Sequence, residues 1–138
     1  MNTVRILPMN HQEEDFVGKT IEEIQKEFFC KTMLEEKGWY NFRTSGLVAE
    51  DGDLVLFQMD SQIIASAAFK DCFHTAGDNE WRGSLVFHCN SIKIFKPISS
   101  NELKEYIPDF VRFNDCKPSL ELTDEQYNKL IERINIGL

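Results

Sequence analysis

Two cysteines and two histidines are the residues of this sequence that could bind a metal ion. Cys72 and His74 stand two positions apart, and His88 is followed directly by Cys89. Thiolate and imidazole are ligands that tetrahedral zinc prefers. Neighbouring side chains on a strand point to opposite faces, so His88 and Cys89 reach one ion only if the strand ends between them. We therefore expect ordinary thiols and histidines without a metal or other cofactor, although the sequence leaves open whether the four side chains meet.

The same residues could also support nucleophilic catalysis. Cys89 paired with His74 or His11 would give a reactive thiolate of lowered pKa. No local motif accompanies this pair, and a buried structural cysteine is the more common case. The acidic run from Glu13 to Asp15 is more typical of a solvated face than of an acid/base pair.

The glycines exclude two large classes of nucleotide-binding enzyme. Dinucleotide and P-loop sites need closely spaced glycines between a strand and a helix. The seven glycines here are scattered over positions 18, 38, 46, 52, 77, 83 and 137. The pairs Ser45-Gly46 and Gly83-Ser84 also lack the glycine-flanked turn that presents a serine nucleophile. We therefore predict that the chain is not an enzyme.

Aromatic and basic side chains flank the middle of the chain and form the candidate binding site. Flat aromatic faces stack on nucleobases or cations, and Arg donates to phosphates and base edges. The aromatic residues could equally be core, because strand aromatics usually pack against an opposite layer. Trp81 and Arg82 lie in a polar stretch and are expected to be exposed. The candidate binding residues are Trp39, Tyr40, Arg43, Phe57, Trp81 and Arg82.

Short apolar runs bounded by turn residues predict about six strands to position these groups. The central feature is a hairpin, in which Leu54–Phe57 and Gln62–Phe69 are joined by a turn at Asp60-Ser61. The second arm contains several small residues, which suits a strand packed on both faces or bent at a barrel corner. Further strands are predicted at residues 3–7, 39–43, 84–88 and 92–95.

Three capping patterns predict the helices. Thr20 with Glu23 begins a helix that should end near residue 30, and Ser99 with Glu102 begins a short helix that Pro108 stops. The third pattern, at residues 123 and 126, precedes an apolar stripe of helical spacing that should end near residue 137. This last helix should close over the sheet.

Composition restricts the class of protein. The 138 residues, 42% of them hydrophobic, suit one folded domain spanning residues 1–138. No apolar stretch has the length of a membrane span, there is no secretory signal, and the cysteines are widely spaced, so we expect a cytoplasmic protein. The net charge of −8 argues against broad nucleic-acid binding, but it allows a basic rim around one pocket.

The run Gly52-Asp53-Leu54-Val55-Leu56-Phe57 followed by Gln62–Ala67 resembles the central hairpin of PUA-like domains, a group that includes PUA, ASCH and EVE domains. The stretch from Ile92 to Tyr106 resembles the strand and short helix that accompany it. The resemblance implies a small, strongly curved barrel flanked by helices, with a pocket that in several members receives a flipped or modified nucleobase. It would place Trp39, Tyr40, Arg43, Phe57 and Trp81 around that pocket.

These observations predict an α+β fold, with a small curved mixed or antiparallel sheet or barrel and two or three flanking helices. The preferred function is a non-catalytic binding module with an aromatic-lined pocket for a nucleobase or for a modified nucleic acid, either RNA or DNA. A second hypothesis is an acidic protein-interaction module that binds a basic partner through an anchor at Trp81. A small enzyme that uses Cys89 or a metal ion is the third. The ligand and the oligomeric state stay open.

Overall fold

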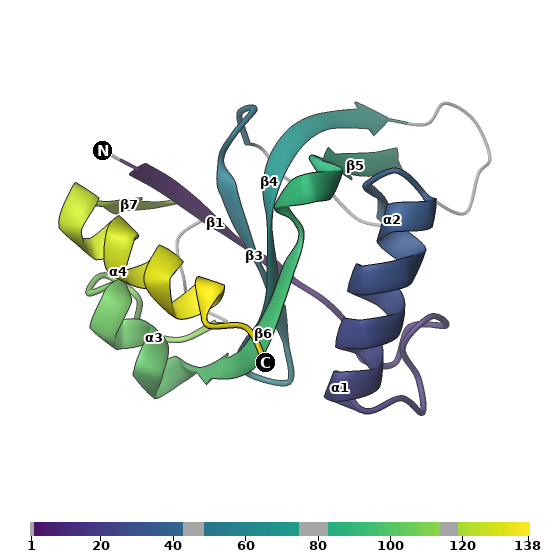
Figure 1. The fold of residues 1–138 in the computed structure, drawn as a ribbon, viewed down its shortest axis with the longest axis horizontal. Coiled ribbons are helices and arrows are strands. Elements are labelled where there is room, and N and C mark those ends of the chain that lie inside the picture. The colour runs from purple at the N-terminus through teal and green to yellow at the C-terminus, as the bar shows by residue number, and fades with distance from the viewer. Residues whose placement is uncertain (1, 43–48, 75–82, 114–118) are drawn as a thin grey trace.

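A curved β-sheet with helices on both faces forms the structure. The computed structural model describes residues 2–42, 49–74, 83–113 and 119–138. The first helical segment covers one face of the sheet, and the two later helices, α3 and α4, lie on the opposite side (Figure 1). The predicted α+β class is confirmed. Within the described ranges, no helix has both the length and the apolar character needed to cross a membrane.

The sheet contains seven strands in the described part of the chain, and six of them follow the order β2-β5-β4-β3-β1-β7. The remaining strand, β6, pairs with β4 beside this path. The order has two ends, so the sheet is open rather than closed into a barrel. Only β1 and β3 run parallel among the described pairs. The bounds are β1 (Asn2–Pro8), β2 (Trp39–Phe42), β3 (Leu54–Met59), β4 (Gln62–His74), β5 (Gly83–Phe87), β6 (Lys93–Ser99) and β7 (Leu120–Leu122).

The three predicted helix starts are confirmed. Thr20 and Thr123 each form a reciprocal capping box, and the Ser99 side chain accepts from the Glu102 backbone. The first helix extends beyond residue 30, because its middle part is wound as a wider π-helix that continues into a final α-helical turn. The bounds are α1 (Ile21–Ile24), η1 (Gln25–Thr32), α2 (Met33–Glu35), the one-turn η2 (Cys89–Ser91), α3 (Ser100–Tyr106) and α4 (Asp124–Asn135).

Alternation along the strands builds two apolar clusters, one on each face of the sheet. On β3, Val55 and Phe57 join the cluster under η1, whereas Leu54 and Leu56 join the cluster under α3 and α4. Successive side chains of a strand point to opposite faces, so one strand supplies both cores. Helical segments cover both faces of β3, which explains why this strand is apolar at nearly every position.

The long strand β4 pairs with three other strands. One edge pairs with β3, and the opposite edge pairs first with β6 and then, from Phe69 onward, with β5. Ala68 lies between the last β6 partner and the first β5 partner. Its N–H donates to Ser91 Oγ at 2.7 Å, and its carbonyl accepts from the His88 N–H at 3.0 Å. The turn η2 therefore replaces the missing strand at this point.

A buried glutamine ties the first helical segment to the same strand. Gln25 is 2% exposed, and its Nε2 donates to the carbonyls of Ile64 at 2.9 Å and Phe95 at 2.7 Å. The ladders of β4 with both β3 and β6 skip a residue at Ile64, which is a β-bulge. The amide thus satisfies carbonyl groups where regular pairing is interrupted.

His11 fastens the N-terminal loop to the turn between β3 and β4. Its Nδ1 lies 2.7 Å from Asp60 Oδ2, and its Nε2 lies 2.6 Å from the Lys19 carbonyl oxygen. Both partners are acceptors, so both hydrogen bonds form only when the imidazole is protonated and donates from each nitrogen. The hydrogen bonds to the Lys19 carbonyl and to Asp60 raise the pKa of His11.

We predict that His11→Gln lowers the free energy of unfolding more at about pH 5.5 than at about pH 8.5. The folded-state pKa is raised, so the stabilisation is complete below the unfolded value of about 6.5 and is lost as the pH rises through the folded value. Urea unfolding of both proteins at each pH measures the difference. An equal loss of stability at the two pH values would contradict the conclusion that protonated His11 makes both hydrogen bonds.

Gly38, at the start of β2, is a position that no larger residue fits. Its φ is +86°, and an added Cβ would lie 2.1 Å from the carbonyl oxygen of Phe87. Gly52 has a similar φ of +94° but has no atom within 4 Å of an added Cβ. It is therefore a matched control that separates backbone conformation from contact.

We predict that Gly52→Ala costs about 1–2 kcal/mol of unfolding free energy, the conformational penalty alone. Gly38→Ala should cost at least about 3 kcal/mol, because the Phe87 backbone must also shift and its N–H bond to the Gly38 carbonyl is disturbed. Chemical denaturation of both variants tests this. Equal losses would show that the close approach is relieved without cost.

Candidate functional site

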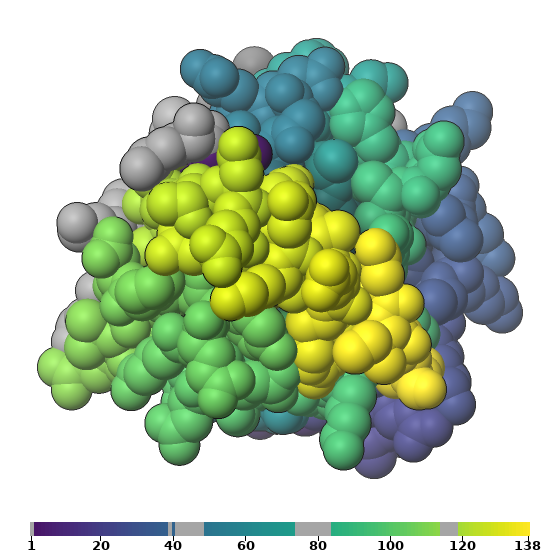
Figure 2. All heavy atoms as spheres, turned by 60° about the vertical axis from the view of Figure 1, so that its left-hand side comes forward, coloured from purple at the N-terminus to yellow at the C-terminus, as the bar shows by residue number. Residues whose placement is uncertain are grey.

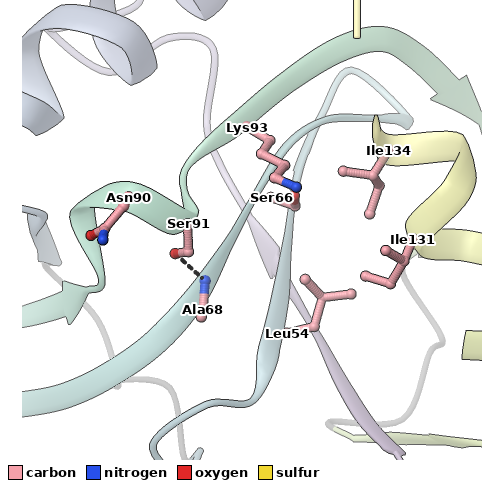
Figure 3. Close-up of a pocket in the computed structure, with 8 residues that line it drawn as sticks. All are labelled: Leu54, Ser66, Ala68, Asn90, Ser91, Lys93, Ile131 and Ile134. Carbon is pink, nitrogen blue, oxygen red and sulfur yellow. Dashed lines mark hydrogen bonds between the residues drawn. The ribbon is translucent and has the colours of Figure 1, made fainter. Parts of the chain in front are cut away.

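A pocket of about 260 Å³ lies where β4 changes its partner strand. Its wall is formed by β3 and β4, by η2 and the start of β6, and by α4 (Figure 3). Figure 2 looks onto the layer formed by α3 and α4, which covers much of this face of the sheet. The lining residues are Leu54, Ser66, Ala68, Asn90, Ser91, Lys93, Ile131 and Ile134.

Small side chains on β4 create the space. In the β3–β4 ladder, Leu54 lies opposite Ala68 and Leu56 lies opposite Ser66. Residues opposite each other in an antiparallel pair share a face, so both small side chains stand on the face that α4 covers. Leu54 packs in one cluster with Ile134 of α4. The helix therefore closes over the leucine side, and the alanine and serine leave the neighbouring volume unfilled.

Ser66 places a hydroxyl group in the wall of this pocket. The residue is 1% exposed, and no buried side-chain nitrogen or oxygen atom of the described residues is left without a hydrogen-bond partner. Buried polar groups in folded proteins nearly always have a partner, either protein or water. A hydroxyl group in the pocket wall can both donate and accept, so Ser66 can also bind a polar atom of a ligand.

The remaining polar lining comes from η2 and β6. Asn90 is exposed and offers both donors and an acceptor, whereas the Ser91 hydroxyl is already engaged, accepting from Ala68 and donating to the His88 carbonyl at 2.6 Å. Lys93 is the one charged residue among the eight lining residues, and its Nζ donates to Asn135 Oδ1. The pocket thus combines an aliphatic wall with a polar, cationic edge.

The turn η2 is held in place before any ligand arrives. His88 immediately precedes it, and His88 Nε2 lies 2.7 Å from Asp51 Oδ1. The His88 backbone also binds Ala68 and accepts from the Ser91 N–H at 3.0 Å. These contacts fix the wall that carries Asn90, so ligand binding does not have to order this part of the chain.

Tyr40 and Phe57, two of the predicted binding residues, come together in the core. Tyr40 is 8% exposed and Phe57 is fully buried, with their ring centroids 6.1 Å apart. The ring of Phe57 also packs against Phe29 and Phe87 at centroid distances of 4.9 and 5.1 Å. Burial raises the pKa of Tyr40, with smaller contributions from Glu13 and Asp15. Packing accounts for both rings without a ligand.

The other predicted binding residues are not placed by the structure. Trp39 lies on β2 opposite Val86, but the description does not extend to its side chain. Arg43, Trp81 and Arg82 lie outside the described residues. The binding role of the six residues therefore stays a prediction. The pocket between β4, η2 and α4 is lined by aliphatic and polar residues and includes none of these six.

Cysteine and metal chemistry gain no support from the described residues. Within them, no three side chains of His, Cys, Asp or Glu are grouped so as to hold a metal ion. Burial, with a smaller contribution from Asp71, raises the pKa of the Cys72 thiol, and burial alone raises that of Cys30. Both shifts disfavour the reactive thiolate.

Sequence reasoning missed the residues that line the pocket, although one signal was present. The run Ala65-Ser66-Ala67-Ala68 is unusually small for a central strand, and we interpreted it as a bend or as packing on both faces. Its alternate members, Ser66 and Ala68, form one wall of the pocket. The small residues of this run were the signal in the sequence for a pocket at this point of the strand.

Ser91→Ala is predicted to lower the free energy of unfolding by about 1–3 kcal/mol, because the Ala68 N–H loses its acceptor. Hydrogen exchange of the Ala68 amide should accelerate more than that of neighbouring strand amides. Ser100→Ala, at the start of α3 and outside the pocket lining, is the matched control and should change stability by less than about 0.5 kcal/mol. An unchanged rate of hydrogen exchange at the Ala68 amide would show that the Ser91 hydroxyl does not protect it.

No family model matches the chain, and no curated protein matches it. Among solved structures, its fold is similar to that of ZmASCH, a mutant protein from Zymomonas mobilis, with a TM-score of 0.51. The alignment covers 95% of this chain and 96% of that chain at 12% sequence identity. At this identity the comparison shows the fold alone. The chain therefore shares its overall α+β architecture with that solved structure.

Proposed function

We propose that this protein is a binding module that takes a small planar ligand of the nucleobase class into the pocket between β4, η2 and α4. The observation that carries the proposal is the lining of this pocket, where an aliphatic wall stands beside the polar groups of Ser66, Asn90 and Lys93. The volume of about 260 Å³ is close to the lower end, roughly 300 Å³, of known ligand sites. It suits one ring system rather than a larger cofactor.

The chemistry of the wall supports a flat, partly polar ligand. Leu54, Ile131 and Ile134 offer aliphatic surface to the faces of a ring, and Ser66 and Asn90 offer hydrogen bonds to its edge. This division between apolar wall and a few placed polar groups is typical of small-molecule sites. A nucleobase has both features, since its faces are apolar and its edge carries donors and acceptors.

The charge balance favours a single base or nucleoside over a long nucleic acid. Tight binding of a nucleic-acid phosphate backbone needs contacts from many Lys and Arg side chains. The pocket lining supplies one lysine, and the chain carries a net charge of −8. If the base belongs to RNA or DNA, recognition should depend on the base and only weakly on the flanking phosphates.

The test is a titration of the purified protein with uracil, cytosine, adenine and guanine and with their nucleosides, followed by amide NMR shifts. We expect saturable shifts at residues of β4, η2 and α4 for at least one base. Ser66→Ala should weaken that binding about 2- to 12-fold, which corresponds to one hydrogen bond of about 0.5–1.5 kcal/mol. Ser66→Thr keeps the hydroxyl and should bind like the wild type.

Ser100→Ala serves as the control for a serine outside the pocket, and thermal unfolding of every variant shows whether the fold is retained. Short single-stranded oligonucleotides form a second arm of the experiment. Saturable binding that leaves the pocket amides unshifted would place the site elsewhere. The absence of shifts with every base and nucleoside would contradict the proposal and would favour the acidic protein-interaction module.

A further inference from the structure

We propose that the pocket selects ligands that carry a single anionic group, a carboxylate on the ring or a phosphate attached to it, and that Lys93 is the residue that selects them. This inference rests on the proposed function and names the ligand class of the same site. It comes from the position of one ammonium group, that of Lys93, beside Ser66 in the wall of the pocket.

The strand register places these two side chains together. Ser66 of β4 lies directly opposite Lys93 in the antiparallel β4–β6 pair. Opposite residues share a face, with Cβ atoms about 4.5–5.5 Å apart. Figure 3 shows both side chains at the same side of the pocket, across from Leu54 and the two isoleucines of α4. A ligand whose edge reaches the serine hydroxyl therefore also has an ammonium group beside that edge.

The ammonium group is not neutralised by the protein. Within the described residues, Lys93 forms no ion pair, and its Nζ donates to the neutral amide oxygen of Asn135. None of the eight lining residues is acidic. Nearby cations are treated differently, since Arg133 is paired with Glu102 and Arg5 with Asp53. Among the residues that line the pocket, Lys93 therefore offers a positive charge that no described acidic side chain neutralises.

An anionic group of a ligand would bind the Lys93 ammonium group more strongly than the neutral amide of Asn135 does. A hydrogen bond between an ammonium and a carboxylate or phosphate is roughly twice as strong as one to a neutral acceptor. The hydrogen bond to Asn135 of α4 uses only one of the three ammonium protons of Lys93. Lys93 can therefore bind an anion and keep this contact. The apolar wall beside the contact excludes water on one side, which reduces screening of the charge.

The experiment compares neutral and anionic ligands of the same shape. Uracil is paired with orotate, which adds a carboxylate to the same ring, and uridine is paired with uridine 5′-monophosphate. We expect one anion of these pairs to bind about three- to tenfold more tightly than its neutral partner at low salt, with the advantage reduced at high salt. The orotate arm reports an anion on the ring, and the monophosphate arm reports one beyond the sugar. Nicotinamide and nicotinate repeat the comparison with another ring.

Variants at Lys93 assign the preference. Lys93→Gln should abolish the difference in affinity between the anion and its neutral partner, and Lys93→Arg should retain that difference. Lys104→Gln, on the exposed surface of α3, is the matched control for loss of one positive charge and should change neither affinity.

The two proposals fail in different ways. If uracil or nicotinamide binds and its anion binds no more tightly, the anion preference is wrong and the pocket remains a site for neutral bases. A preference that persists in Lys93→Gln would likewise overturn the role of this lysine. If no member of any pair shifts the pocket amides, the proposed function itself fails.

Discussion

The fold depends on how the backbone of Ala68 is satisfied. This residue stands on the central strand at the point where one neighbour, β6, has ended and the next, β5, has not begun. An open N–H and carbonyl there would cost free energy and would expose the middle of the sheet to solvent. The Ser91 hydroxyl and the His88 N–H close the gap. The turn η2, which together with His88 supplies these groups, also forms one wall of the pocket. The interruption of strand pairing at Ala68 and the candidate site therefore have the same structural origin.

The local signals in the sequence predicted most of the elements. Capping residues such as Thr20 and Thr123 satisfy backbone groups within one turn, so their effect is readable without knowing the rest of the fold. The central hairpin is equally local. The three-residue strand β7 was missed, because it forms only through pairing with β1 at the other end of the sequence. The wider winding of η1 also had no signal that we recognised.

The candidate site could not be predicted in the same way. Its key pair, Ser66 and Lys93, becomes adjacent through a ladder that skips a residue at Ile64, and no rule of alternation specifies where such a bulge occurs. The aromatic residues, in contrast, were assigned to a site by their chemistry. Phe57 shows why that reasoning is incomplete, since the same ring that could stack on a base is fully enclosed by Phe29 and Phe87.

The position of β1 has a consequence for the protein during its synthesis. Residues 2–8 are synthesised before both of their partners, since their parallel partner is β3 and their other edge is covered by Leu120–Leu122. Until residues 120–138 are synthesised, one edge of β1 and the sheet face later covered by α4 stay open to other chains. A nascent chain of this protein should therefore be a substrate for chaperones that recognise extended apolar segments, and translation pauses before residue 120 should increase its aggregation.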